Sequence, residues 1–442
     1  MENKKKMENK KEKLLVLGSS IGTEYIIRYA RELGAYTVVT DSFDTDKSPC
    51  KLLADEYWMI DAQDYDVLEA RCVKEGITGI MAASSEFCGD AALRLCTDLG
   101  LPHHASETSW FYARNKAEFV AKCAETGMEV PREYIMSDEE AKAPETVMDN
   151  VVFPVIVKPV DGSGSRGINV CNNREELKNG IEKALSFSES GRYVIEEYIR
   201  GNDIAALYYV NEGIPELHML AELHFIELNG KPKMSLISGQ SQLYYSYLEA
   251  CGEKVKHLFE AMDIRNGEVI LQYIHKDGHF YIYEMGHRID GLGMWLSDKK
   301  VNGVSFLEQS VESALGRAVA HHDQSAFDQK GKCSANYILW AKPGKVCFKS
   351  GREALENTEG IDVFEDRYRP GESIIADGSF MQGAYIVSIE AQSPDDMAER
   401  IRLVNEKLKL TDEDGNDMLI RYEDPDFCQR TRSRMEQDRG GS

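Results

Sequence analysis

The feature that most constrains the fold is an apolar run that ends in a lysine and opens into a loop of small residues. Residues 155–158 read Val-Ile-Val-Lys, and the loop that follows contains Gly162, Ser163, Gly164 and Ser165. Successive backbone N–H groups in such a loop can form a concavity that binds anions, and the lysine adds an ammonium group at the strand end. In a Walker A loop the lysine follows the glycines, whereas here it precedes them. We therefore expect a nucleotide-phosphate site of another type.

Composition excludes several classes of protein. The net charge of −23 over 442 residues argues against nucleic acid as a main partner, because contacts to phosphates need a basic face. No run reaches the ~18 consecutive apolar residues that a membrane span requires, and the N-terminus has no apolar segment of a secretory signal. Ten cysteines occur without a Cys-x-x-Cys pair, as expected for reduced thiols. We expect a cytoplasmic protein with no membrane and no nucleic-acid partner.

The chain begins with a β-α-β pattern. Residues 13–17 and 36–40 are apolar enough for strands, and residues 23–33 carry apolar side chains at helical spacing. This order predicts a parallel sheet. Gly18, Gly22 and Asp41 leave open a dinucleotide site, in which the glycines face the pyrophosphate and the acid binds the ribose. The Gly-x-x-x-Gly spacing disfavours that alternative.

The rest of the chain predicts an α+β part and then a strand-rich part. We expect helices over residues 65–75, 86–99, 114–127, 174–185, 306–315 and 394–408, and a helix-rich insertion over residues 238–264. Strands are expected over residues 78–82, 151–158, 193–197, 204–210, 217–226, 268–274, 279–285, 333–340, 345–348, 361–364 and 384–390.

Four motifs in this order resemble the ATP-grasp superfamily: the lysine-ended strand, the small-residue loop, Glu196-Glu197-Tyr198-Ile199, and Glu284-Met285-Gly286-His287-Arg288. The resemblance covers about residues 13–423. It is strongest to the carboxylate–amine ligases and to the domains of biotin carboxylase and carbamoyl phosphate synthetase.

The resemblance implies a multidomain α/β and α+β fold. It comprises a disordered leader (1–12), a Rossmann-like pre-ATP-grasp domain (13–112), an ATP-grasp domain with two α+β subdomains (113–320), a strand-rich C-terminal part (321–425) and a disordered tail (426–442).

The same resemblance implies how ATP is held. Lys158 and Lys116 reach the phosphates, and the loop with Gly162, Ser163, Gly164 and Ser165 closes over them. Glu196, Glu197, Tyr198 and Ile199 form a hinge that reads the adenine, and Asp203 accepts both ribose hydroxyls, as a carboxylate can. Lys116 and Glu197 are also compatible with solvent-facing positions.

A metal site is implied by Gln272 and Glu284, which lie on two strands joined by a hairpin and so can share one face. Their oxygens suit Mg²⁺, with Mn²⁺ as the second choice. The superfamily usually has Glu-x-Asn-x-Arg at the second position. Here Gly286 stands where asparagine is usual, so one metal contact is missing or comes from water, the backbone or His287. Arg288 is kept, and its planar guanidinium suits a carboxylate or an acyl phosphate.

The implied enzyme is an ATP-dependent ligase with Lys158 and Arg288 as catalytic residues. It activates a small-molecule carboxylate as an acyl phosphate, joins it to an amine, and releases ADP and phosphate, and it is expected to be a homodimer. Two alternatives stay open. One is a bicarbonate-activating enzyme of the carboxylase or carbamoyl phosphate type. The other is a non-catalytic ATP-binding protein, which Gly286 favours.

Overall fold

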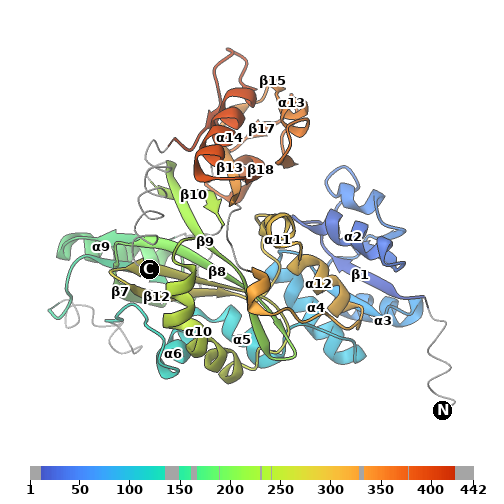
Figure 1. The fold of residues 1–442 in the computed structure, drawn as a ribbon, viewed down its shortest axis with the longest axis horizontal. Helices are drawn as coiled ribbons and strands as arrows, with labels where there is room; N and C mark the ends of the chain where they lie inside the picture. The colour runs from blue at the N-terminus through green and yellow to red at the C-terminus, as the bar shows by residue number, and fades with distance from the viewer. Residues whose placement is uncertain are drawn as a thin grey trace.

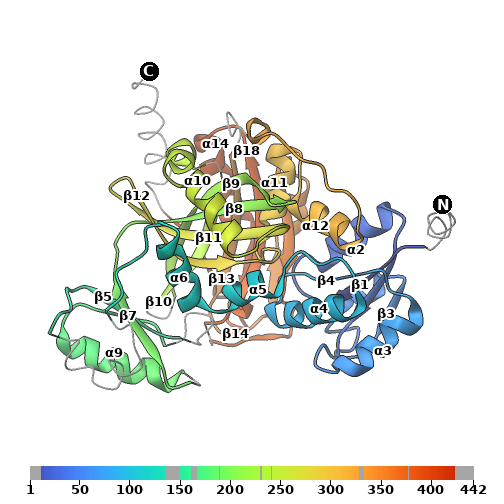
Figure 2. The same cartoon turned by 90° about the horizontal axis from the view of Figure 1, so that it is seen from below.

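The computed structural model describes residues 11–134, 149–160, 167–188, 190–228, 231–239, 241–327, 333–376 and 378–423. Figures 1 and 2 show an N-terminal sheet with its helices at one side, a long central sheet, and a small lobe around α9 at the opposite side. Apart from residues 11 and 12, the expected leader lies outside the described residues, and so does the expected tail.

The N-terminal sheet is parallel, as the β-α-β pattern predicts. Its order is β3-β2-β1-β4, with β1 (Lys13–Leu17), β2 (Tyr36–Thr40), β3 (Glu56–Trp58) and β4 (Gly79–Ala82). Helices α2 (Thr23–Glu32), α3 (Tyr65–Glu75) and α4 (Glu86–Leu99) accompany it, with a short 3-10 turn at Pro49–Leu52. Leu14 to Leu17 are fully buried, because a parallel sheet is covered on both faces.

The helix expected over residues 114–127 is present as α6 (Lys116–Glu125), two residues shorter at each end, and a separate helix that was not expected, α5 (Glu107–Arg114), precedes it. The two helices are separated by Asn115, whose backbone is extended. The Asn115 side chain donates a hydrogen bond to the carbonyl of Phe111 (2.8 Å). Asparagine competes for backbone groups in this way, which favours helix ends over helix interiors. The break places Lys116 at the first turn of α6.

The small lobe is an antiparallel sheet of order β6-β5-β7 with one helix on it. Its strands are β5 (Val155–Pro159), β6 (Asn169–Cys171) and β7 (Tyr193–Glu197), and its helix is α9 (Arg174–Ser186). The helix packs closely, since a Cβ on Gly180 would lie 2.8 Å from Cys171 Sγ. The first strand begins at Val155 and not at residue 151, because Pro154 has no N–H to give to the ladder.

The large sheet has the order β12-β11-β8-β9-β10-β13-β18-β16, with β20 paired to β13. Its strands are β8 (Asn202–Asn211), β9 (Ile214–Leu228), β10 (Lys231–Ser238), β11 (Gly267–Lys276), β12 (His279–Gly286), β13 (Cys333–Ala341), β16 (Ile361–Asp366), β18 (Gly383–Ala391) and β20 (Leu419–Ile420). Strand β10 was not expected. It pairs with β13 through Leu236 and Tyr337, so strands on both sides of residue 320 share one sheet. The domain limits themselves stay a prediction.

Helices cover the large sheet. They are α10 (Tyr244–Ala261), α11 (Met294–Asn302), α12 (Phe306–Ala314) and α14 (Pro394–Lys407). The smaller elements are β14 (Gly344–Lys345), β15 (Phe348–Ser350), α13 (Arg352–Glu356), β17 (Ser373–Ile374), β19 (Lys409–Thr411) and 3-10 turns at Gln324–Phe327 and Phe380–Gln382. Helix α11 was not expected; Asp290 Oδ1 accepts the N–H groups of Leu292 (2.7 Å) and Met294 (3.1 Å) at its start. Asp290 thus accepts the first backbone N–H of the helix, whose N-cap residue is Gly293.

Candidate functional site

Lys158 and Glu196 form an ion pair on the small lobe. Lys158 Nζ lies 2.7 Å from Glu196 Oε2, and Glu196 is only 5% exposed. The residues are diagonal neighbours, because Ile156 of β5 stands opposite Glu196 of β7. A buried carboxylate needs such a partner. Lys158 shortly precedes residues 161–166, which lie outside the described residues. The predicted phosphate loop with Gly162, Ser163, Gly164 and Ser165 falls in that range.

Glu133, which the sequence did not single out, adds a second acid to this pair. Its backbone forms an isolated bridge with that of Glu196. Burial and then the charge of Glu196 raise the pKa of Glu133, while Lys158 lowers it. The site thus contains two carboxyls around one lysine.

The predicted hinge uses part of its backbone within the protein. Glu197 N–H donates to the carbonyl of Arg132 (2.8 Å), and Tyr198 N–H donates to that of Pro154 (3.1 Å). Ile199 is buried, whereas Glu197 and Tyr198 are partly exposed. An adenine at this hinge must therefore use groups other than these two N–H donors.

Gln272 and Glu284 stand directly opposite each other on β11 and β12. Lys116 Nζ, from the first turn of α6, lies 2.8 Å from Glu284 Oε1. One carboxylate and one amide oxygen side by side suit a magnesium ion whose other ligands are phosphates and water. Among the described residues, no group of three or more His, Cys, Asp or Glu side chains is placed to hold a metal ion.

The backbone does not require a glycine at position 286. A Cβ built on Gly286 would lie 3.9 Å from its nearest neighbour, Ile270, and the residue does not have a positive φ. The position has room for a side chain. The absence of a third metal-binding oxygen is therefore a property of the sequence and not a consequence of packing.

Asp203 lies on β8 next to this group. It stands opposite Ile274 of β11, and the Tyr283 hydroxyl donates to its Oδ1 at 3.4 Å. Burial raises the pKa of Asp203 to about 6, although the hydrogen bond from Tyr283 acts in the other direction. The Asp203 carboxyl is half-buried and can accept further hydrogen bonds, so it suits the two hydroxyls of a ribose.

Arg288 lies just beyond β12, between the large sheet and the N-terminal sheet. Its Nε is 3.3 Å from Glu86 Oε1 at the start of α4, and its Nη1 donates to the carbonyl of Ile289 (3.2 Å). Arg114 pairs with the same glutamate. The neighbouring His287 is buried and faces the Asn266 carbonyl (3.0 Å). Burial, and to a lesser extent the charge of His104, lowers the pKa of His287 to about 3. His287 is therefore a neutral side chain that packs within the fold.

Asp41, the acid of the dinucleotide alternative, is occupied within the fold. Lys51 Nζ lies 2.8 Å from Asp41 Oδ1, and the Ser48 hydroxyl donates to Oδ2 at 2.7 Å. Lys51 is 1% exposed, so the pair is buried. A ribose could reach this carboxylate only by breaking a buried ion pair, which is costly.

Residues 151–294 match the ATP-grasp domain family. The chain carries an ATP-grasp domain. A D-alanine–D-alanine ligase of Staphylococcus saprophyticus is 38% identical over 91 residues, which are 20% of this chain and 25% of that protein. The N-terminal section of the carbamoyl phosphate synthase large chain of Methanopyrus kandleri is 24% identical over 215 residues, 46% of this chain and 36% of that protein. The chain thus spans about a quarter to a third of these relatives' length.

Solved structures share the fold well beyond the ATP-grasp domain. The L-amino acid ligase from Bacillus licheniformis matches with a TM-score of 0.72 at 18% identity, over 92% of this chain and all of that one. Biotin carboxylase from Campylobacter jejuni matches with a TM-score of 0.77 at 16% identity, over 95% and 97%. These likenesses show that the chain shares the fold of these structures. In the described part of the chain, each helix is too short or too polar to cross a bilayer.

Proposed function

We propose that the protein is an ADP-forming ligase that joins a small carboxylate to an amine. The observation that carries this proposal is the order of groups along β12 and its end. Gln272 and Glu284 offer metal-binding oxygens, and Arg288 follows four residues later with a guanidinium that a carboxylate can bind. The similarity to a D-alanine–D-alanine ligase and to an L-amino acid ligase supports the reaction class.

Each residue has a part in positioning and charge neutralisation, which account for most of the catalysis of phosphoryl transfer. Lys158 and Lys116 hold the phosphates from the small lobe and from α6, and the hinge at Glu196 and Glu197 holds the adenine. Asp203 holds the ribose. A magnesium ion on Gln272 and Glu284 supplies positive charge to the phosphates when bound.

Arg288 holds the acid so that its carboxylate oxygen meets the terminal phosphate. The acyl phosphate that results has phosphate as its leaving group, and the amine displaces it. The guanidinium then stabilises the oxygen on which negative charge develops. In this proposal the N-terminal parallel sheet is the Rossmann-like domain that helps to hold the carboxylate, opposite Arg288.

We propose further that the protein is a cytoplasmic homodimer. The biotin carboxylase domain of a 2-oxoglutarate carboxylase from Hydrogenobacter thermophilus was solved as a dimer, and it matches 98% of this chain with a TM-score of 0.76. Gel filtration with light scattering measures the state of this protein directly.

Bicarbonate activation is the second candidate, because biotin carboxylases and a carbamoyl phosphate synthase section are among the similar proteins. It predicts ADP release on addition of bicarbonate without an added amine. A ligase of the proposed type releases ADP only with a suitable acid, and product forms only with an amine.

The deciding experiment is a coupled ADP-release screen of carboxylate and amine pairs, with mass spectrometry of the product. Arg288→Ala should keep nucleotide affinity and lose product, because Arg288 binds the acid and not the nucleotide. Glu253→Gln, an exposed substitution on α10, is the matched control. Tight ATP binding without ADP release over the whole panel contradicts the proposal and favours a non-catalytic nucleotide-binding protein.

A further inference from the structure

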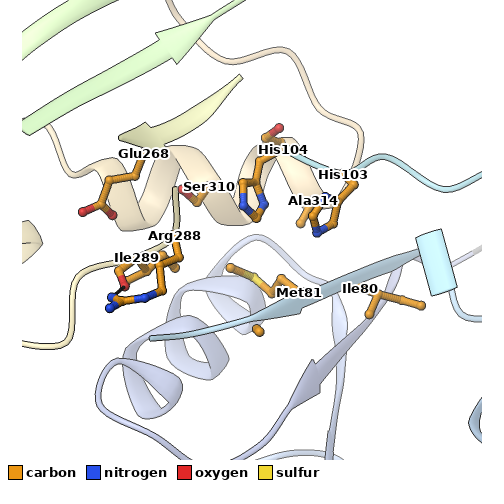
Figure 3. A pocket seen from close by; sticks show the side chains of 11 residues that line it. Ile80, Met81, His103, His104, Glu268, Arg288, Ile289, Ser310 and Ala314 are labelled. Atoms are coloured by element: carbon orange, nitrogen blue, oxygen red, sulfur yellow. Dashed lines mark hydrogen bonds between the residues drawn. The ribbon is translucent and has the colours of Figure 1, made fainter. Parts of the chain in front are cut away.

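A small pocket lies behind Arg288, where the N-terminal sheet meets the large sheet. Its cavity volume is about 20 Å³, and it is lined by Glu268 of β11, Arg288, Ser310 and Ala314 of α12, and the histidines His103 and His104. Figure 3 shows Glu268 and Arg288 at one end of the pocket and His103 at the other. The walls therefore come from segments far apart in the sequence. Nothing in the ATP and metal site described above uses this space.

Glu268 presents a buried carboxylate oxygen that lacks a hydrogen bond. The residue is 1% exposed; its Oε1 accepts the N–H of Asp290 (3.2 Å), whereas its Oε2 has no hydrogen-bond partner in the described part of the chain. His103 Nε2 is also buried and has no hydrogen-bond partner among the described residues. Leaving a buried polar atom without a partner costs on the order of 1–3 kcal/mol. The pocket is thus built to hold a hydrogen-bonding molecule.

The surroundings favour a hydrogen-bond donor from which Glu268 can take a proton. Burial, and after it the charge of Asp290, raises the pKa of Glu268 well above its ordinary value, so this carboxyl is a stronger base than an exposed glutamate. Burial lowers the pKa of His104 to about 4, and burial and His104 lower that of His103. The imidazoles are therefore neutral at pH 7, whereas Arg288, which lines the same pocket, places a positive charge near Glu268 and lowers its pKa.

We propose that this pocket receives the nitrogen nucleophile, either ammonia or the terminal amino group of a primary amine, with Glu268 Oε2 as its hydrogen-bond acceptor. This inference rests on the proposed ligase function and adds the amine side of the site. The volume admits about one water-sized group, so the nitrogen enters and any larger part of the amine stays outside. Arg288 lines the pocket, so the nitrogen lies next to the group that holds the acid.

The proton balance follows from this placement. The nucleophile enters as an ammonium, and one N–H proton moves to the Glu268 carboxylate, which frees the nitrogen lone pair. The C–N bond then forms while the C–O bond to phosphate breaks. The second N–H proton leaves on the phosphate as hydrogen phosphate. Glu268 returns its proton to solvent before the next turnover.

The test uses the full chain and needs neither ATP nor the acid. The unfolding temperature is measured in ammonium, methylammonium, potassium and tetramethylammonium chloride against sodium chloride at equal ionic strength. A ligand that binds only the folded state raises this temperature by mass action. We expect a rise with ammonium that Glu268→Gln abolishes and Glu253→Gln leaves unchanged. A rise with ammonium alone assigns ammonia, and a rise with methylammonium as well assigns a primary amine.

Three results overturn the proposal: no rise with ammonium, an equal rise with potassium, or a rise that survives Glu268→Gln. If Glu268→Gln does not fold, Ala314→Val fills the pocket with the carboxylate intact and must remove the ammonium effect. ATP affinity is measured on the same variants. An ammonium effect without any ligation in the screen refutes the ligase function alone, and ligation without an ammonium effect refutes the pocket alone.

Discussion

At the scale of single residues, Gly286 is the departure with the clearest consequence. Gly286→Asn places an amide oxygen beside Glu284 in a position with room for it. We expect the Mg²⁺ concentration needed for nucleotide binding to fall several-fold, because the ion gains a protein ligand. Calorimetric titration of ADP at increasing Mg²⁺ measures this. Gly286→Ala is the control that adds a side chain without an oxygen, and an equal change in both variants would refute the metal role of this position.

His218 gives a second prediction at this scale. It is fully buried on β9, where it stacks on Phe327 and its Nδ1 lies 2.8 Å from Asp298 Oδ2. Its Nε2 faces Glu216 Oε2 at 3.7 Å. Burial lowers its pKa, but Asp298 and Glu216 outweigh burial and raise the pKa to about 8. The aromatic side chains of Tyr209 and Phe306 also face this ring.

A folded-state pKa above the unfolded value of about 6.5 stabilises the fold at low pH. This contribution, about 2 kcal/mol, is fully present below pH 6.5 and is lost as the pH rises through 8. Urea unfolding at pH 6 and pH 9 measures it. His218→Gln should remove the difference, whereas His257→Gln, an exposed side chain on α10, should keep it. A pH dependence that persists in His218→Gln would show that other groups cause it.

At the scale of elements, the pairing of β5 with β7 brings the side chains of Lys158 and Glu196 into an ion pair. Lys158→Met leaves a buried carboxylate without its cation, which costs about 3 kcal/mol or more. We expect weaker ATP binding and a lower unfolding temperature. The double variant Lys158→Met/Glu196→Gln should recover stability but not ATP affinity, because the phosphate contact of Lys158 stays lost. Lys183→Ala on the exposed face of α9 is the control. Recovery of ATP affinity in the double variant would exclude a phosphate contact by Lys158.

At the scale of the whole molecule, the large sheet makes the C-terminal part necessary for folding. A chain ending at residue 320 lacks β13 and leaves β10 with an open edge, and Leu236 loses the C-terminal side chains that cover it. An exposed apolar edge strand pairs with other chains. We expect this chain to aggregate in gel filtration, whereas a chain ending at Glu423 keeps every described strand. A monodisperse, cooperatively unfolding 1–320 fragment would instead show that a domain boundary lies there.

The sequence alone determined the elements with strong local signals. The strand over residues 13–17 and the helix over residues 65–75 were predicted at their observed limits, because periodicity and flanking turn residues are local properties. Strand β10 and helix α11 were missed. The first depends on pairing with distant β13, and the second on the hydrogen bonds that Leu292 and Met294 donate to Asp290, which no periodic pattern reveals.

For the candidate site, the sequence supplied the residue types, namely Lys158, Gln272, Glu284 and Arg288. The tertiary structure decided their partners. It set Lys116 against Glu284 and Arg288 against Glu86, and it placed Glu268 in a pocket with His103. Glu86 and Glu268 carry no sequence signal, since a lone glutamate in a helix or strand is ordinarily solvated. Burial and neighbours from other parts of the chain give such a group its chemistry, and these exist only once the chain has folded.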